Sequence, residues 1–409
     1  MRSLNRQISI VPDRPDLFAV WSSFAVLMFC MTALGPVLAE IRTEFDISFA
    51  GIGFIVAVQG MGRGGFMLLL GSLADKVSAR RLLTLGLVAT GLSMLVVAAA
   101  PNIWVLVIGL LTGGLGFGLV APSAQVHVAQ RTQADQRRRD IGRMMSGGMF
   151  GAFLAPIAAG FLASSLGWRA AFVAVAILAL CSASLVSLVR SLDAPQTPNP
   201  APSKSWWSAL ELRRSVLAVS VLAVLLWGWA NAARGIVLPL YGIVGLGLGP
   251  DGVGLLLTIT LGGRAVLFFV SGSFVNRFGM VLPLVITCLT GIVGTLILLA
   301  TPTTTTYIAL GVAFAFNGLS SPLILMLLAE RAPSHRMGRA VGVTQFLVDL
   351  VGLAMPPLIG LILDLAGFSM VGVLLAVMSA LALVWGVRVI REVNPSTRPD
   401  LPHQNQSPN

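Results

Sequence analysis

The fold follows from one stretch of sequence, Gly71-Ser72-Leu73-Ala74-Asp75-Lys76-Val77-Ser78-Ala79-Arg80-Arg81. The apolar run before it covers roughly 49–72 and the run after it roughly 82–100, and each is about one bilayer thickness long. The stretch is therefore predicted to form a tight turn at a membrane surface. Basic residues in such a turn determine which side is cytoplasmic, and the small residues let two helix ends approach closely.

This turn resembles the signature loop of the major facilitator superfamily, which connects the second and third transmembrane helices of that family. The glycine, the aspartate, the basic residue and the paired arginines fall where the signature has them, and Ser78 stands where glycine is usual. We expect a conformational latch here, made by Gly71, Asp75, Arg80 and Arg81. In it, the Asp75 carboxylate accepts from a neighbouring helix N-terminus or from the two arginines.

Composition supports a membrane location. Of 409 residues, 56% are hydrophobic and only 11% are charged, and the mean hydropathy is +0.89. These values predict an all-α polytopic membrane protein. The net charge of +11 comes from basic residues that gather on alternate loops and both tails. That asymmetry predicts contact with membrane lipid and no nucleic-acid partner.

Twelve apolar segments can be drawn along the chain, and we expect them to form two six-helix bundles. The predicted parts are a cytoplasmic tail (1–16), a first bundle (17–190), a proline-rich cytoplasmic linker (191–215), a second bundle (216–393) and a disordered tail (394–409). The expected helices cover 17–40, 49–72, 82–100, 103–129, 141–165, 169–190, 216–243, 252–275, 280–300, 305–329, 337–363 and 368–391. The distribution of basic residues predicts that both termini lie on the cytoplasmic side of the cell inner membrane.

The two halves repeat. The stretch at 71–76 recurs at 272–277, where Asn276 replaces the aspartate, and Pro122 recurs as Pro322. Several matches near one offset, each at the same topological place, indicate an internal duplication. Six plus six helices in parallel repeat is the architecture of the facilitator superfamily.

A few polar residues lie deep in the predicted helices. An ionisable group there costs at least a few kcal/mol, so it must face a partner or a wet cavity. Three arginines against one carboxylate predict a site for an anion, unless the arginines snorkel to the interface or bind backbone carbonyls. The charged residues are Arg63, Arg234, Arg264 and Asp349, and their uncharged companions are Gln59, Asn231, Asn317 and Gln345.

Arg63 and Arg264 differ by 201 positions, which is the offset of the repeated loop, and each follows a glycine. As pseudo-symmetry mates they are predicted to converge on the axis between the bundles and to clamp an acidic group. Nitrate and nitrite porters of the superfamily, which this pair resembles, hold their anion with arginines on the same helices. The chain lacks their asparagine-containing, glycine-rich helix signature, which argues against nitrate itself.

Asp349 is the single carboxylate near the middle of a predicted helix. It is the residue we expect to couple transport to protons. The alternative is a plain ion pair between Asp349 and an arginine that locks two helices together.

The fifth helix carries a further resemblance. Gly142, Gly151, Pro156 and Gly160 follow the spacing of the antiporter signature of drug–proton antiporters, with alanine at two glycine positions. The resemblance implies export, whereas taken physically the pattern predicts a bent helix packed tightly at the domain interface. The fourth helix has Gly109 where those antiporters carry a proton-handling arginine, which argues against proton coupling by that route.

These observations predict a secondary active transporter, not an enzyme, that works by alternating access. It would export a small anionic or amphipathic organic solute in exchange for protons. The alternatives are an importer or exchanger of a small anion without proton coupling, and a non-transporting membrane sensor of the same fold. We expect a monomer with no cofactor and no metal.

Overall fold

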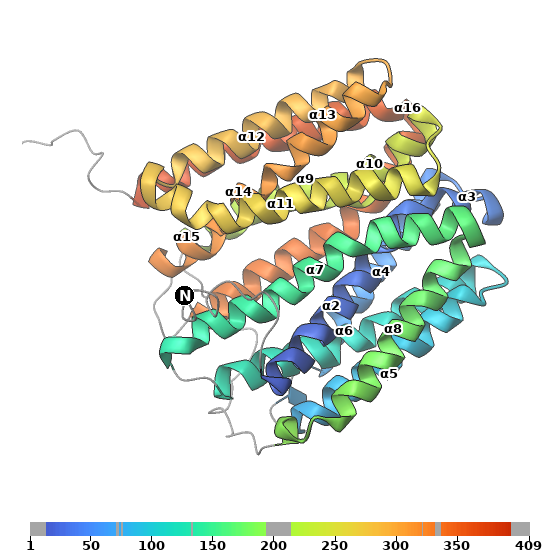
Figure 1. The fold of residues 1–409 in the computed structure, drawn as a ribbon. Coiled ribbons are helices and arrows are strands. Elements are labelled where there is room, and N and C mark those ends of the chain that lie inside the picture. The colour runs from blue at the N-terminus through green and yellow to red at the C-terminus, as the bar shows by residue number, and fades with distance from the viewer. Residues whose placement is uncertain are drawn as a thin grey trace, which may run out of the picture.

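The computed structural model describes residues 14–70, 73–74, 77–131, 134–193, 214–320, 322–331 and 337–393. Within these ranges the chain is helical apart from the short turns between elements, and it contains no strand, which confirms the predicted all-α fold (Figure 1). Gly71, Asp75, most of the predicted linker and most of both predicted tails lie outside the described residues.

The first half of the molecule, residues 14–193, is a group of packed helices. Their bounds are α2 (Pro15–Thr32), η1 (Gly35–Val37), α3 (Leu38–Phe45), α4 (Phe49–Leu70), α5 (Ala79–Ala98), α6 (Ile103–Arg131), α7 (Ala134–Leu166), α8 (Trp168–Leu188) and the short η3 (Arg190–Asp193).

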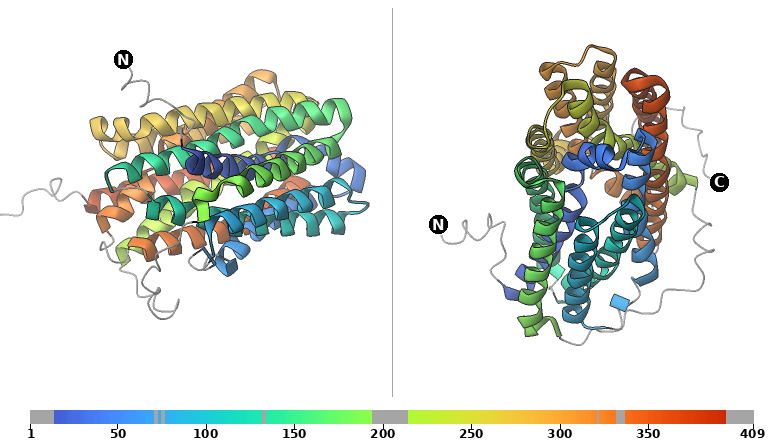
Figure 2. Two further views of the ribbon diagram at one scale, coloured as in Figure 1. Left: turned by 60° about the horizontal axis from the view of Figure 1, so that its bottom comes forward. Right: turned by 90° about the vertical axis from the view of Figure 1, so that its right-hand side faces the viewer.

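The second half, residues 214–393, is a second group. Its elements are α9 (Arg214–Ala232), η5 (Ala233–Val237), α10 (Leu238–Leu240), η6 (Tyr241–Gly245), α11 (Pro250–Phe278), α12 (Val281–Leu296), η7 (Ile297–Leu299), α13 (Thr304–Ala315), α14 (Asn317–Ser320), α15 (Leu323–Arg331) and α16 (Met337–Val393). In two views the yellow-to-red helices lie together beside the blue-to-green ones (Figures 1 and 2).

The described part of the chain holds nine helices that are long and apolar enough to cross a membrane. Two shorter apolar helices, Val216–Gly228 and Arg234–Gly245, lie between them in sequence. One of the nine, Val343–Glu392, is twice the length that a bilayer needs, with 50 residues. Twelve separate crossings therefore stay a prediction.

Local breaks follow from proline and glycine. Pro36 lies in the 3₁₀ turn that separates α2 from α3, and Pro239 lies between two π-helical turns, Ala233–Val237 and Tyr241–Gly245. Proline has no N–H to donate to the preceding turn, so the backbone around it loosens. Gly367 interrupts α16 with a φ of 71°, a conformation that costs glycine little. The segment 364–366, expected between two helices, is helical up to this break.

Apolar side chains both fill the interior and cover the outside of the molecule. Leu83, Ile236 and Leu375 are fully buried, whereas Leu69 and Phe161 are widely exposed. In lipid, the backbone must satisfy its hydrogen bonds within each helix, while the side chains can remain apolar on every side. This explains why hydropathy alone does not show which face of a helix points inward.

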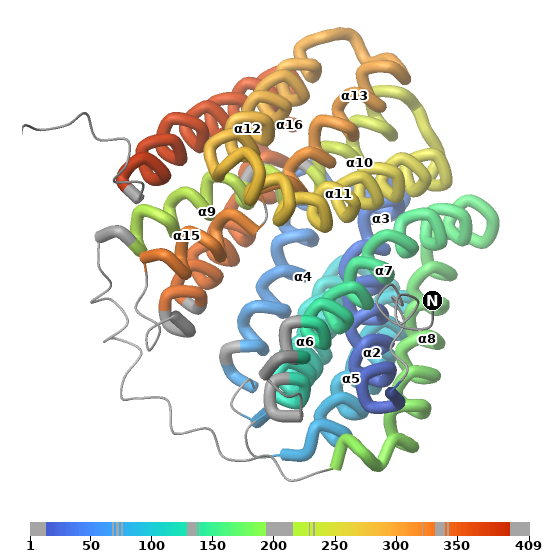
Figure 3. The backbone as a smooth tube through the Cα atoms, turned by 60° about the vertical axis from the view of Figure 1, so that its left-hand side comes forward, coloured from blue at the N-terminus to red at the C-terminus, as the bar shows by residue number. Residues whose placement is uncertain are grey.

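The two halves meet along two seams, one between α4 and α16 and the other between α7 and α11. Glycine allows the backbones to touch: a Cβ at Gly360 would collide with the Phe49 carbonyl, and one at Gly254 would collide with the Pro156 carbonyl. These contacts lie at the end of the molecule that carries α3 and α10 (Figure 1). Toward the opposite end the two groups of helices diverge (Figure 3).

Polar contacts reinforce this closed end. The Asp364 carboxylate accepts hydrogen bonds from the backbone N–H groups of Phe49, at 3.0 Å, and Ala50, at 2.8 Å. It thereby caps the N-terminus of α4 from the other half, where a negative charge is stabilised by the helix dipole. On the second seam, Thr258 Oγ1 accepts from the backbone N–H of Ile157 at 3.1 Å.

Candidate functional site

A cavity of about 500 Å³ lies between the two halves. Residues of both halves line it, from α2, α4 and α7 on one side and from α9, η5, α11 and α16 on the other. Its charged lining residues within the described chain are three arginines and one carboxylate: Arg63, Arg234, Arg264 and Asp349. The four deep ionisable residues expected from the sequence therefore share one cavity.

Arg63 and Asp349 form an ion pair across the first seam. Arg63 Nη2 lies 3.0 Å from Asp349 Oδ1, and the Gln345 amide donates a second hydrogen bond of 3.0 Å to the same oxygen. The Arg63 guanidinium also lies over the Phe117 ring, 5.6 Å from its centroid. Both charged side chains are partly exposed to the cavity, at 36% and 24%. Asp349 thus neutralises one of the three arginines.

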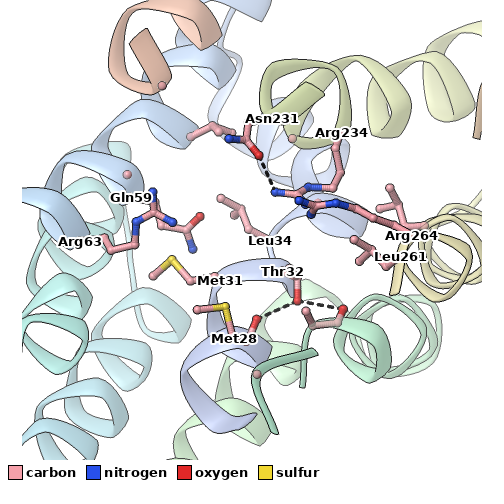
Figure 4. A pocket seen from close by; sticks show the side chains of 18 of the residues that line it. Met28, Met31, Thr32, Leu34, Gln59, Arg63, Asn231, Arg234, Leu261 and Arg264 are labelled. Carbon is pink, nitrogen blue, oxygen red and sulfur yellow. Dashed lines mark hydrogen bonds between the residues drawn. The ribbon is translucent and has the colours of Figure 1, made fainter. Parts of the chain in front are cut away.

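Arg234 and Arg264 form the opposite wall (Figure 4). Arg234 projects from the π-helical turn Ala233–Val237 and donates a 3.0 Å hydrogen bond to Asn231 Oδ1. Within the described ranges neither arginine forms an ion pair with a carboxylate. The positive charges of Arg264 and Arg63 both act on Arg234. This wall therefore carries uncompensated positive charge.

The side of the cavity formed by the first half is mainly apolar. Met28 and Met31 of α2 face the space in front of the arginines (Figure 4), and Met145 and Met149 of α7 also line it. The polar Thr32 is bonded to backbone, with its hydroxyl donating to the Met28 carbonyl at 2.9 Å. Polarizable, flexible methionine side chains adapt to ligands of varied shape.

The uncharged candidates are placed differently from one another. Gln59 and Asn231 line the cavity, and buried Gln59 donates to the Cys30 carbonyl at 3.5 Å. Asn317 is buried away from the cavity lining and donates to the Leu226 carbonyl at 3.4 Å. Gln345 reaches the site through its bond to Asp349.

The residues of the predicted helix 5 pattern do not share one role. Pro156 lines the cavity and Gly160 packs against the Pro250 carbonyl on the second seam. Gly151 packs inside the first half against the Ala25 carbonyl, and among the described residues no atom lies within 4 Å of a Cβ built on Gly142. Only part of the pattern therefore contributes to the contact between the halves.

Of the predicted latch, the structure describes the two arginines. Arg80 pairs with Asp193 of η3 at 2.9 Å and donates to the Ser187 carbonyl at 3.4 Å. Arg81 is exposed. Because Gly71 and Asp75 are outside the described residues, the latch stays a prediction.

Sequence reasoning missed Asp364 and the methionines. Asp364 is near a helix end, where an acidic residue carries no topological signal. The methionines did leave a signal, because the spacings of three in Met28/Met31 and four in Met145/Met149 place each pair on one helix face.

Comparison with known proteins agrees with this architecture. The sequence pattern of the Major Facilitator Superfamily matches residues 20–356. An uncharacterised transporter of Escherichia coli strain K12, YgaY, is 34% identical over 152 residues, which are 37% of this chain and 38% of that protein. The multidrug resistance protein MdtG of Escherichia coli O1:K1 is 34% identical over 113 residues, 27% of each chain. The chain thus aligns with well under half the length of these relatives.

Solved structures show the same fold at low identity. A bacterial homologue of the human lysosomal transporter Spinster, inward-facing and unoccupied, superposes with a TM-score of 0.75 at 15% identity, over 94% of this chain and 98% of that one. A D-xylose–proton symporter superposes with a TM-score of 0.74 at 18% identity, over 93% and 98%. With the family pattern matched across most of its length, the chain belongs to the Major Facilitator Superfamily and is a multi-pass membrane protein.

Proposed function

We propose that this protein is a secondary active transporter that exports a small anionic or amphipathic organic solute by alternating access, in exchange for protons. The observation that carries the proposal is the cavity between the halves, where three arginines face one carboxylate. A surplus of positive charge in a membrane interior is stabilised by a negatively charged ligand. The multidrug resistance protein among the relatives supports export.

The contacts between the two halves are the ones that alternating access would break and form again. One end of the cavity is closed by glycine-mediated backbone contacts and by Asp364, and the helices diverge at the other end (Figure 3). Rocking of the two halves would break these contacts and open that end instead. With basic loops on the cytoplasmic side, the arrangement corresponds to a cavity open to the cytoplasm, in a monomer of the inner membrane with both termini cytoplasmic.

A second candidate is an importer or exchanger of small anions without proton coupling. It is favoured by the Arg63–Asp349 pair, because the bonds of Asp349 to Arg63 and to Gln345 already give this carboxylate a structural role at the α4–α16 seam. In that case Asp349 serves only to join α4 and α16.

Counterflow in proteoliposomes tests both candidates. Purified protein is reconstituted with an unlabelled organic anion inside, the labelled anion is added outside, and uptake is followed with and without a pH gradient. Exchange-driven uptake supports transport, and accumulation that requires the gradient supports proton coupling. Absence of uptake for every organic anion tested, from vesicles in which the protein is folded, would contradict the proposed function and favour a non-transporting sensor.

A further inference from the structure

We infer that the ligand of this cavity is an amphipathic organic monoanion, whose acidic group binds between Arg234 and Arg264 and whose apolar body lies against the methionine wall formed by Met28, Met31, Met145 and Met149. This inference rests on the proposed transport function and names its substrate class. It also replaces Arg63, expected from the repeat to clamp the anion together with Arg264, by Arg234.

Charge selects the pair. Arg63 has its carboxylate at 3.0 Å, so its charge is already neutralised inside the protein. Arg234 and Arg264 have no such carboxylate partner within the described chain. Both side chains are half-buried, and both belong to the second half of the molecule. The two guanidinium groups lie side by side in the cavity wall (Figure 4), so their like charges repel each other, and one anion placed between them relieves the repulsion of both.

Geometry supports the same pair. Asn231 Oδ1 accepts a 3.0 Å hydrogen bond from one arm of the Arg234 guanidinium, which orients the planar group, and among the described residues its other N–H groups have no hydrogen-bond partner. Planar guanidinium groups match the two oxygens of a carboxylate, sulfonate or phosphate. The π-helical turn at Ala233–Val237, next to Pro239, sets Arg234 into the cavity. π-helical turns of this kind occur frequently at functional sites.

The methionine wall, which faces Arg234 and Arg264, favours an organic anion over an inorganic one. Apart from Arg63, the first half lines the cavity with uncharged residues, and four of them are methionines. A cavity of about 500 Å³ is within the size range of sites for organic ligands, which combine apolar walls with a few placed polar groups. A small inorganic anion would leave the methionine wall facing only water. An apolar body carrying one acidic group uses both walls.

A set of naphthalene probes tests the inference. Binding to the purified full-length protein in lipid nanodiscs is measured by calorimetry for 2-naphthoate, 2-naphthalenemethanol, 2-naphthylmethylammonium and acetate, with empty nanodiscs subtracted. We expect 2-naphthoate to bind at least tenfold more tightly than the alcohol, the amine or acetate. The ranking requires no variant, so it holds even where a substitution prevents folding.

Variants then locate the acidic group. Arg234→Gln and Arg264→Gln should each weaken 2-naphthoate at least tenfold and leave the alcohol unchanged, and the lysine variants should fall between, because lysine keeps the charge without the planar fork. Arg388→Gln, an exposed arginine of α16, is the matched control and should bind like the unmodified protein. Met149→Ser should weaken 2-naphthoate without changing acetate.

Several results would overturn the inference. They are equal binding of the acid, the alcohol and the amine, acetate binding as tightly as 2-naphthoate, no binding by any probe, or glutamine variants that bind 2-naphthoate normally. Counterflow of 2-naphthoate separates this failure from failure of the proposed function. Arginine-dependent binding without counterflow contradicts transport and leaves the site standing, whereas counterflow that ignores the arginines contradicts the site and leaves transport standing.

Discussion

Arg63 of α4 donates a 3.0 Å hydrogen bond to Asp349 of α16, 286 positions further along the chain. The two helices that it joins belong to different halves and form one of the two seams. The pair lines the cavity, so a ligand or a proton that reaches it acts directly on a contact between the halves. Partly exposed and hydrogen-bonded to Gln345, it is a charge pair that can be separated at moderate cost.

Asp349→Asn should abolish accumulation driven by a pH gradient while exchange continues, because the amide can neither bind nor release the coupling proton. Proteoliposome uptake with a gradient, compared with counterflow, measures this. Glu392→Gln, an exposed change on the same helix, is the control. Equal loss of both activities would indicate that the pair only locks α4 to α16.

The strength of the same pair can be measured with Arg63→Gln, Asp349→Asn and the double variant. If the two side chains interact as the geometry shows, thermal unfolding should give a coupling energy of roughly 0.5–3 kcal/mol. The losses of stability in the two single variants should add up to more than the loss in the double variant. Each single variant leaves one charge without its partner, whereas the double variant leaves none. A coupling energy near zero would mean that the two charges are held apart by solvent in the membrane-embedded protein.

Asp364→Asn should weaken the closed end. The neutral amide keeps one acceptor oxygen but loses the charge that two backbone N–H groups of α4 stabilise, and loss of a helix cap costs about 1 kcal/mol. Spin labels at exposed Thr43 and Ser369, measured by electron–electron double resonance in a cysteine-free background, should show a larger population of long distances. Asp46→Asn is the control, because Asp46 is an exposed carboxylate nearby whose left-handed φ of 47° asparagine also tolerates. Identical distance distributions for Asp364→Asn and the unmodified protein would show that the cap does not hold this end closed.

Gly360→Ala should act on the same end through sterics. The added methyl group meets the Phe49 carbonyl, so α4 and α16 must separate or distort, at a cost of about 1–3 kcal/mol to the closed conformation. The same labels should report a shift toward longer distances. Gly272→Ala provides the comparison, since no atom of the described chain lies within 4 Å of its added Cβ and alanine favours a helix. A normal distance distribution in Gly360→Ala would indicate that α4 and α16 accommodate the added methyl group without moving apart.

Topology follows from the basic loops and can be tested separately. A green fluorescent protein fused after residue 200 should fluoresce, and alkaline phosphatase fused there should be inactive, because the linker is expected on the cytoplasmic side. Fusions after Asn102, in the short turn before α6, should give the reverse pattern. The opposite result at both sites would mean that the protein has the reverse orientation in the membrane, with the divergent end of the helices on the external side.

Much of the candidate site is predictable from the sequence. Arg63, Arg234, Arg264 and Asp349 stand out because a charge in a long apolar run must have a polar surrounding, and the structure places all four on one cavity. Their pairing was not predictable in this way. The repeat pointed to Arg63 and Arg264 as equivalent, but Asp349 has no mate in the first half, so one arginine is neutralised and the other is not.

By itself, the sequence determined the class of fold. Runs of about 20 apolar residues between basic turns can be accommodated only as helices in lipid, because each helix satisfies its own backbone hydrogen bonds. Tertiary structure alone decided which faces of those helices meet. Apolar side chains surround most of the helices, so packing of glycine against backbone sets how each helix is rotated. At the α4–α16 seam, where Gly360 packs against the Phe49 carbonyl, this packing places Arg63 next to Asp349.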